Sequence, residues 1–556
     1  MRTTTAIEQA VRKAISSAQE KGDLPATSAP IVKIEKPKLA EHGDFSTSVP
    51  LTLARSMRMD PKAIGAEIIK SLPDNPIIGR SWVAPPGFVN FSLSDDWLIA
   101  QIDEIKKTGF SYGSSDYGQG KHVQVEFVSV NPTGPLHVGH ARGAVLGSGI
   151  ANVLEQVGYI VQREYYVNDA GAQMQVFYET LHARYMQASG KKIDLPNPSY
   201  PGEYLISLAE QLYLENPDLV DLNKDQIIAE LGPKAVDRII ENIKNVLSKL
   251  NIKYDAWFYE SSLISNKTMT KVLDELGGKN IIIDRDGAKW FRTTLYGQAE
   301  DDVVIRSKDS IPTYFGTDLA YHYDKFRIRK FDRVINVWGA DHHGHVDRLK
   351  AAVEAIGIAP ENLTVVLNQI VSFRENGESV RFSKRKGVIF TVEELLGEVG
   401  PDACRFIFLS RSPTSQMEFD LALATRQSSE NPVYYVQYAH ARLASIVKSA
   451  KELKITSDDA DLNLLSNEPE LELLRRLIEF PEVIHRAAID LEPHHVPNYA
   501  LELARTFQRF YEQCRVLSED QSKIATSKAR LALIEAAKIV LAKTLNTMGM
   551  SAPNRM

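Results

Sequence analysis

The sequence has few cysteines and no long apolar run. Only Cys404 and Cys514 occur among 556 residues, both within apolar helical patterns, which argues against a disulfide framework and against a cysteine zinc site. No stretch of 18 apolar residues is present, and the amphipathic N-terminal segment carries acidic residues, so we expect neither a membrane span nor an export signal. These features predict a cytoplasmic protein.

Neither sign of charge dominates the sequence. The 65 Lys and Arg residues stand against 71 Asp and Glu residues, which gives a net charge of −6, so the molecule as a whole does not attract nucleic acid. Any contact with RNA must therefore use local basic patches. An apolar content of 44% and a charged content of 24% are ordinary for a folded protein and exclude a disordered chain. The length predicts three or four domains.

The common nucleotide-binding patterns are missing as well, since neither G-x-G-x-x-G nor the Walker pattern occurs. A different strand–turn–helix element is present in VEFVSVNPTGPLHVGHARGAVLG, residues 125–147. Residues 123–130 are rich in β-branched side chains and predict a buried strand, which the turn NPTGP ends. His137 and His140 would share one face of the first helical turn and donate ring N–H bonds to phosphate oxygens, beside the positive end of the helix dipole. The segment therefore predicts a phosphate-binding site.

A second cationic element lies late in the chain. Residues 380–387 read VRFSKRKG and place four basic side chains within six residues, before a glycine. One helix terminus cannot neutralise a triphosphate, so a loop that lays Lys384 over the developing pyrophosphate charge would complete the site. A basic run alone is more often a solvated or RNA-facing loop. Together with the histidine pair, it favours catalysis.

The second half of the chain alternates strand-like and helical patterns. DDVVIRS, RVINVWGA and LTVVLNQIVSF are strand-like, so we predict a parallel sheet with ligands at the carboxyl ends of its strands. GADHHGH, residues 339–345, directly follows one of these strands. Gly339 would admit the adenosine, and Asp341 would accept a ribose hydroxyl. The three histidines have no compact set of partner ligands, and we predict no metal site.

The histidine segment resembles a known motif. Pro135–His140, PLHVGH, resembles the HIGH motif of class I aminoacyl-tRNA synthetases, and NPTGPLHVGHAR is similar to the arginyl-tRNA synthetase form of that motif. Arg381–Lys384, RFSK, resembles the KMSK loop of the same class, with Arg and Phe where the family has Lys and Met. EHGDFST, YVNDAGAQ and PDACRFIF resemble further segments of arginyl-tRNA synthetases, the last with Cys404 in place of a leucine. The resemblance spans essentially the whole chain.

The resemblance implies a multidomain protein of the α/β and α classes. We expect a Rossmann-type catalytic domain with a parallel sheet and a mainly helical insertion. An N-terminal α/β domain that contacts tRNA would precede it, and a helical anticodon-binding bundle would follow it. The expected ranges are 1–112 for the N-terminal domain, 116–425 for the catalytic domain, about 175–290 for its insertion and 430–556 for the bundle.

The same resemblance implies an arginine–tRNA ligase. Such an enzyme converts L-arginine and ATP into arginyl-adenylate and then transfers the arginyl group to the 3′ end of tRNA(Arg), releasing AMP and pyrophosphate. The reaction implies ATP and Mg²⁺, and we expect a monomer. The implied catalytic residues are His137, His140 and Lys384. The implied ATP-binding residues are Pro135, His137, Gly139, His140, Gly339, Asp341, Arg381, Ser383 and Lys384.

The arginine substrate requires carboxylates for its guanidinium group and an aromatic side chain to fix the plane. Matched to the family, Tyr314 and Asp318 would recognise the guanidinium, and Glu126 and Asn131 would hold the α-amino end. The full set of expected arginine contacts is Glu126, Asn131, His140, Tyr314, Asp318 and His342. Aromatic and cationic side chains of the bundle suit unstacked RNA bases, and the expected tRNA contacts are Tyr434, Tyr438, Arg442, Arg505 and Arg509.

Two alternatives stay open at this point. Another class I synthetase, such as a cysteinyl or glutamyl enzyme, would share both ATP motifs. The missing cysteine zinc set argues against the first, and the acidic Glu126 and Asp318 argue against the second. A non-catalytic tRNA-binding paralogue would keep the bundle, but the intact His137, His140 and Lys384 argue against it.

Overall fold

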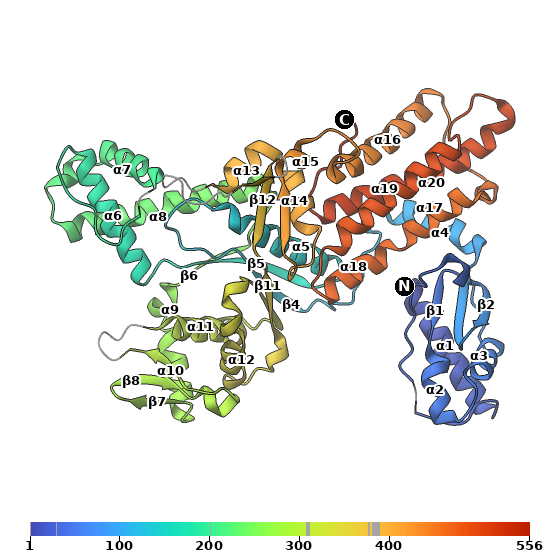
Figure 1. Cartoon of the computed structure of the whole chain (residues 1–556), viewed down its shortest axis with the longest axis horizontal. Helices are drawn as coiled ribbons and strands as arrows, with labels where there is room; N and C mark the ends of the chain where they lie inside the picture. Colours follow the sequence, from blue (N-terminus) through green and yellow to red (C-terminus); the bar gives the residue numbers. More distant parts are fainter. Residues whose placement is uncertain (1, 29, 201, 307–311, 376–377, 381–389) are drawn as a thin grey trace.

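The computed structural model describes residues 2–28, 30–200, 202–306, 312–375, 378–380 and 390–556 (Figure 1). A five-stranded parallel sheet forms its centre, with strand order β11-β10-β4-β5-β6. Because every strand runs in the same direction, all five carboxyl ends meet at one edge of the sheet, where ligands bind in such folds. The bounds are β4 His122–Glu126, β5 Ile160–Val167, β6 Ala256–Tyr259, β10 Arg333–Gly339 and β11 Leu363–Asn368.

The predicted strand over residues 123–130 is shorter than expected, because β4 ends at Glu126. Val128 and Ser129 adopt positive φ angles of 71° and 47°, which are incompatible with a continued strand. The chain then enters a 3₁₀ turn, Val138–His140, and helix α5, Ala141–Gln156. A side chain at Gly147 would lie 2.2 Å from the Phe127 ring, so this glycine lets α5 pack directly on the chain that leaves β4.

The insertion predicted over about 175–290 is mainly helical, and its first part contains α6 Ala172–Ala188, α7 Glu203–Glu215 and α8 Lys224–Lys249. Strand β6 then joins the edge of the parallel sheet by pairing with β5, which the prediction missed. The segment DDVVIRS was predicted to belong to the parallel sheet. Its strand β9, Asp302–Ile305, instead pairs antiparallel with β8 in a separate sheet. This separate sheet is built on a tight β7–β8 hairpin, because the turn residues Asp286 and Gly287 have positive φ and bring β8 back along β7, where β9 can pair with it. The other bounds here are α9 Ser262–Ser265, α10 Thr268–Gly278, β7 Ile282–Arg285, β8 Ala288–Phe291, α11 Tyr314–Tyr323 and α12 Val346–Ala355.

The N-terminal unit packs three helices against the antiparallel sheet β1-β3-β2. It lies beside the bundle in Figure 1 and is joined to it by ion pairs such as Arg475 to Asp44, at 3.1 Å. Asp44 of the EHGDFST segment also accepts a hydrogen bond from the Leu93 backbone, at 2.7 Å, so this segment fixes both the sheet and the interface. The bounds are α1 Thr3–Glu20, β1 Phe45–Thr47, α2 Val49–Met57, α3 Pro61–Lys70, β2 Ile78–Ala84 and β3 Phe88–Leu93.

A helix bundle forms the C-terminal region, and helix α4, Asp95–Thr108, packs against it on α17 and α20. A small sheet of order β13-β12-β14 and the helices beside it connect the bundle to the parallel sheet. In the described part of the chain, no helix is both long and apolar enough to cross a membrane. The bounds are β12 Val371–Glu375, β13 Glu378–Val380, α13 Val392–Val399, α14 Pro401–Leu409, β14 Met417–Asp420, α15 Leu421–Thr425, α16 Pro432–Glu452, α17 Glu468–Ile478, α18 Phe480–Ile489, α19 His495–Gln513 and α20 Ile524–Thr547.

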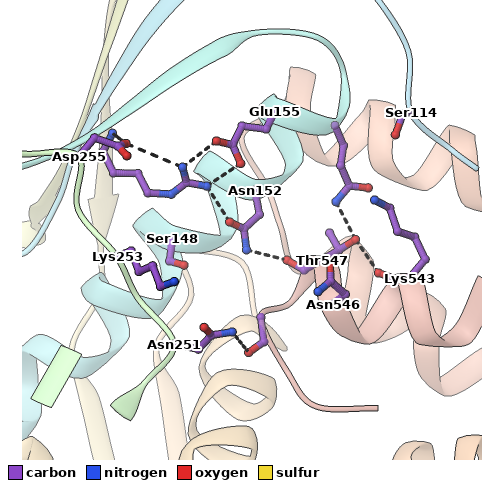
Figure 2. Close-up of a pocket in the computed structure, with 13 residues that line it drawn as sticks. Ser114, Ser148, Asn152, Glu155, Asn251, Lys253, Asp255, Lys543, Asn546 and Thr547 are labelled. Atoms are coloured by element: carbon purple, nitrogen blue, oxygen red, sulfur yellow. Dashed lines mark hydrogen bonds and ion pairs between the residues drawn. The ribbon is translucent and has the colours of Figure 1, made fainter. Parts of the chain in front are cut away.

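The bundle and the catalytic unit meet around a polar pocket of about 600 Å³ (Figure 2). Asn152 of α5 donates to the backbone carbonyl of Thr547 at the end of α20, at 3.0 Å, and Gln156 donates to the Thr547 hydroxyl, at 2.7 Å. Arg405 of α14 is fully buried beneath the pocket and donates to the Leu250 carbonyl, at 2.8 Å. Hydrogen bonds from several elements therefore fix the position of α5, and with it the histidine segment. The predicted fold class is confirmed.

Candidate active site

The candidate residues follow the strand ends of the parallel sheet. Glu126 ends β4, and His137 and His140 come after it. Asn168 and Asp169 follow β5, Glu260 follows β6, and Gly339 ends β10. The predicted phosphate, adenosine and arginine residues therefore share one edge of the sheet, as the parallel topology requires.

The histidine pair has a defined protonation pattern. His137 Nδ1 accepts the backbone N–H of Gly139, at 3.0 Å, so the neutral ring carries its proton on Nε2. Burial and, to a smaller extent, the neighbouring His137 lower the pKa of His140 to about 4, so this ring is neutral at pH 7. The two ring centroids are 6.2 Å apart. His140 Nδ1 is buried and has no partner among the described residues.

The histidine segment is hydrogen-bonded to the chain that follows the basic loop. Val138 N–H donates to the Phe390 carbonyl, at 3.0 Å, and Val392 N–H donates to the Leu136 carbonyl, at 2.9 Å. Of the predicted loop residues, Arg381, Ser383 and Lys384 lie outside the described residues. Next to Phe390, Thr391 forms an isolated antiparallel β-bridge with His137.

Tyr314 and Asp318 begin helix α11 near the same edge. Asp318 Oδ2 accepts a hydrogen bond from His345 Nε2, at 2.7 Å, and the Tyr314 ring lies 5.2 Å from the His345 ring. Burial raises the pKa of the Tyr314 hydroxyl, and the carboxylates of Asp318, Glu126 and Glu260 raise it further. Several carboxylates therefore lie near the Tyr314 hydroxyl, an arrangement that suits a cationic ligand.

Glu260 is one of these carboxylates, although the prediction omitted it. Burial and the nearby carboxylates of Asp318 and Asp169 raise the pKa of Glu260 to about 7. A hydrogen bond from Tyr166 acts in the opposite direction. With its amide oriented toward the carboxylate, Asn168 donates to Glu260 Oε2, at 2.9 Å. The sequence signal is only the short strand AWFY inside a region predicted to be helical, which does not mark its carboxyl end as part of the site.

Glu126 has a buried partner that the prediction also omitted. Lys325 Nζ donates to Glu126 Oε2, at 2.6 Å, and to Asn336 Oδ1, at 3.0 Å. Burial lowers the pKa of Lys325, whereas Glu126 acts in the opposite direction. Lys325 lies in the π-helical turn Asp324–Ile328 that follows α11, and no local spacing marked it as a partner of Glu126. Next to this pair, Glu164 accepts from Arg329, so the two carboxylates on adjacent strands are each neutralised by a cation.

The predicted adenosine residues occupy the end of β10. A side chain at Gly339 would lie 2.3 Å from Asp341 Oδ1, so this glycine leaves room for the Asp341 carboxylate in its present position. Asp341 is exposed, and its carboxylate lies 3.6 Å from His342 Nε2. The His342 ring lies 6.4 Å from that of Tyr314, which joins the adenosine and arginine residues. Asn131 donates to Gln173 Oε1, at 2.6 Å, and Pro135 is partly buried just before the histidines.

The predicted tRNA residues fall into separate groups. The rings of Tyr434 and Tyr438 stack with centroids 5.9 Å apart, and the Arg442 guanidinium lies 4.9 Å from the Tyr438 centroid. Arg442 also lies 4.7 Å from the Tyr511 centroid, so three of the five residues form one cluster with Tyr511, and Tyr438 and Tyr511 are its exposed rings. Arg505 and Arg509 do not join it. Arg505 pairs with Glu502, and Arg509 pairs with Glu472 of α17.

Three family models match the chain in order. A model for the N-terminal domain of arginyl-tRNA synthetases matches residues 5–93, and one for the catalytic domain of class I (R) tRNA synthetases matches residues 101–412. A model for the DALR anticodon-binding domain matches residues 436–556.

Curated relatives match over their full length. The chain is 46% identical to an arginine–tRNA ligase of Dehalococcoides mccartyi strain CBDB1, covering 99% of this chain and 98% of that protein. It is 44% identical to one of Carboxydothermus hydrogenoformans, covering 100% and 99%. The fold also matches the arginyl-tRNA synthetase of Thermus thermophilus with a TM-score of 0.77, at 22% identity over 99% of this chain and 100% of that one. The chain therefore belongs to the arginyl-tRNA synthetase family and is an arginine–tRNA ligase.

Proposed function

We propose that the edge of the parallel sheet binds L-arginine and ATP side by side and joins them as arginyl-adenylate. The observation that carries this proposal is the gathering of the carboxylates of Asp318, Glu126 and Glu260 around Tyr314, at the sheet edge that also carries the histidine pair. A guanidinium is the cation that such planar, multiple carboxylate contacts suit best. The α-carboxylate of the same arginine can then reach a phosphate held by the histidines.

Catalysis in this proposal consists of positioning and charge stabilisation. The arginine carboxylate attacks the α-phosphorus in line, the new C–O–P bond forms, and pyrophosphate leaves with the bonding electrons. His137 and His140 donate ring N–H bonds to the phosphates, and Lys384 stabilises the negative charge that grows on the leaving group. The neutral state of His140 supports this role, since a neutral ring donates one hydrogen bond without needing a counter-charge. No covalent enzyme intermediate is required.

Mg²⁺ fits this site as an ion that arrives with ATP. Asp341 is the exposed carboxylate at the end of β10, and among the described residues this edge contains no set of three converging metal ligands. Mg²⁺ is commonly held by substrate phosphates, water and one or two carboxylates rather than by a protein cage. When bound, it would neutralise charge on the phosphates.

Substrate contacts follow from the same arrangement. We propose that Tyr314, Asp318 and Glu260 recognise the guanidinium and that Glu126, Asn131 and His140 hold the amino-acid end. His342 would separate the arginine pocket from the ATP side, and Pro135, Gly139, Gly339, Asp341, Arg381 and Ser383 would complete the ATP site. The second step transfers the arginyl group to the terminal ribose of tRNA(Arg), and the Tyr434, Tyr438 and Arg442 cluster is the best supported tRNA contact in the bundle. We propose a monomer that acts in the cytoplasm.

The test is aminoacylation of a total tRNA pool with each of the labelled amino acids arginine, cysteine and glutamate. We expect labelled arginine alone to become attached to tRNA, and the reaction to require ATP and Mg²⁺. Attachment of cysteine or glutamate would contradict the substrate assignment. Binding of tRNA without any attachment would show a non-catalytic paralogue.

A further inference from the structure

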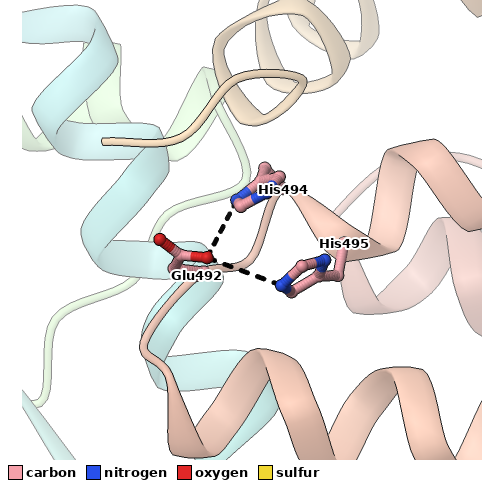
Figure 3. Close-up of side chains that lie close together, drawn as sticks. All are labelled: Glu492, His494 and His495. Carbon is pink, nitrogen blue, oxygen red and sulfur yellow. Dashed lines mark ion pairs between the residues drawn. The ribbon is translucent and has the colours of Figure 1, made fainter. Parts of the chain in front are cut away.

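The corner between α18 and α19 brings together three side chains that the proposed reaction does not use. Glu492, His494 and His495 lie in the segment DLEPHH and point toward one another (Figure 3). Their ligand atoms all lie within 4.8 Å of one another, and they form the one group of three metal-ligating residues found in the described part of the chain.

The separation of these atoms matches a metal site better than it matches hydrogen bonds. Glu492 Oε2 lies 3.9 Å from His494 Nδ1 and 3.5 Å from His495 Nε2. Both nitrogens are buried and have no hydrogen-bond partner among the described residues. A tetrahedral zinc ion with bonds of about 2.0–2.2 Å spaces its ligand atoms roughly 3.3–3.5 Å apart. The two distances from Glu492 lie within about half an ångström of that spacing, and the two histidine nitrogens lie within 4.8 Å of each other.

The backbone and one neighbour hold the three ligands in place. His495 N–H donates to the Glu492 carbonyl, at 3.3 Å, and Val496 N–H donates to the Pro493 carbonyl, at 3.0 Å, so the corner is one hydrogen-bonded turn. The Ser412 hydroxyl donates to Glu492 Oε1, at 3.5 Å, which leaves Oε2 for the histidines. A carboxylate oriented by an outer hydrogen bond is a common feature of metal sites.

We propose that Glu492, His494 and His495 bind a divalent transition metal ion, with zinc as the best match, and that water fills the fourth position. Imidazole and carboxylate ligands suit zinc and its neighbours rather than Mg²⁺ or Ca²⁺. The site is structural. Pro493, between the ligands, lies against Gly149 of α5, with 3.3 Å between Pro493 Cβ and a Cβ built at Gly149. The ion would therefore fix the corner of the bundle on the helix that begins at the histidine pair. This differs from the prediction of no metal site, which considered only the GADHHGH histidines and the cysteines.

The experiment uses the full chain, stripped with EDTA and desalted. Zn²⁺ is titrated in competition with a chromophoric chelator, and Co²⁺ is titrated separately, because tetrahedral Co²⁺ gives visible absorption that a surface ion does not. We expect one tight site per chain and a higher thermal midpoint with Zn²⁺. His494→Ala and His495→Gln should each weaken Zn²⁺ binding by about 100-fold or more, since outer partners alone contribute about 10–100-fold.

Two control variants test whether histidines outside the group contribute to the measured Zn²⁺ binding. His485→Ala removes a histidine of α18 outside the group, and His343→Ala removes an exposed histidine of GADHHGH, and both should bind Zn²⁺ as the native chain does. Circular dichroism of the metal-free variants checks that they fold. The Co²⁺ spectrum of the native chain tests the site without any variant, so the result does not depend on whether the variants fold. Absence of tight binding by the native chain, or full binding by the His494→Ala/His495→Gln double variant, would overturn the proposal.

Discussion

His345 Nε2 lies 2.7 Å from Oδ2 of Asp318, and this bond ties helix α11 to the segment that follows β10. Both side chains are about nine-tenths buried, with exposed fractions of 9% and 11%. One carboxylate oxygen of Asp318 is therefore held in place, and the other can face the arginine pocket. A carboxylate fixed in this way recognises a planar guanidinium without first losing side-chain freedom.

Loss of the Asp318 carboxylate should act on arginine and spare ATP. Asp318→Ala removes one charge-assisted partner of the guanidinium, so we expect the arginine KM to rise about 10–100-fold and the ATP KM to change little. The measurement is steady-state aminoacylation with each substrate varied in turn. Asp341→Ala is the matched control, because its effect should fall on the ATP KM instead. An equal rise in both constants for Asp318→Ala would contradict the assignment.

Arginine binding should depend on pH through Glu260, whose pKa is raised to about 7 by burial. A bound guanidinium favours the charged carboxylate and lowers this pKa, so binding releases a proton near pH 7. We therefore expect arginine affinity to rise as the pH increases toward 7 and to level off above about pH 8. Calorimetry in two buffers of different ionisation enthalpy measures the released proton. Glu260→Gln should remove the dependence, and a native chain without proton release would argue against the role.

His140→Ala should slow adenylate formation without blocking substrate binding. The variant removes a donor to the phosphates, so we expect ATP–pyrophosphate exchange, measured with tRNA present, to fall by ~10²-fold or more. His343→Ala, an exposed histidine of GADHHGH, serves as the control and should retain native exchange. Native exchange by His140→Ala would remove it from the mechanism.

Lys325 should matter for stability. Lys325→Met leaves the buried carboxylate of Glu126 without its cation, which should lower the free energy of unfolding of the catalytic unit by about 3–5 kcal/mol. Lys289→Met removes the cation of a surface pair with Asp284 and should cost less than about 1 kcal/mol. Chemical denaturation followed by fluorescence compares the two. Similar losses in both variants would mean that the buried pair is not important to folding.

A change in the aromatic cluster of the bundle should affect only the binding of tRNA. Tyr438→Ala removes one stacking surface, worth about 1–3 kcal/mol per base, so we expect the KM for tRNA to rise about tenfold. Lys448→Ala changes an exposed cation of the same helix, α16, and should leave this KM unchanged. Aminoacylation at varied tRNA concentration measures both. An unchanged KM in Tyr438→Ala would place the tRNA contact elsewhere.

The residues that could be predicted from the sequence are those whose chemistry depends on local spacing. His137, His140 and Gly339 lie next to strand ends that hydrophobic patterning reveals, and the parallel topology brings them to one edge. Glu260 was missed because β6 has only four residues within a helical region, and its place at the sheet edge depends on pairing with β5. Long-range pairing of this kind leaves no local pattern.

Ion pairs between distant segments could not be predicted from the sequence either. Glu126 and Lys325 are 199 positions apart, and neither residue alone indicates a buried partner. The group of Glu492, His494 and His495 is the opposite case. Its residues are adjacent in sequence, but their significance depends on a turn that points the three side chains inward, which spacing does not predict.

The pairing of Leu136–Val138 with Phe390–Val392 uses main-chain groups only. Every residue other than proline carries the same N–H and C=O, so these hydrogen bonds do not depend on side-chain identity, although Leu136, Val138 and Val392 are also buried in the core. A single-residue insertion or deletion would shift the register and turn alternate side chains to the opposite face. A substitution at these positions would therefore keep the main-chain bonds and change the packing, whereas a change in chain length between Phe390 and Val392 would misalign the pair.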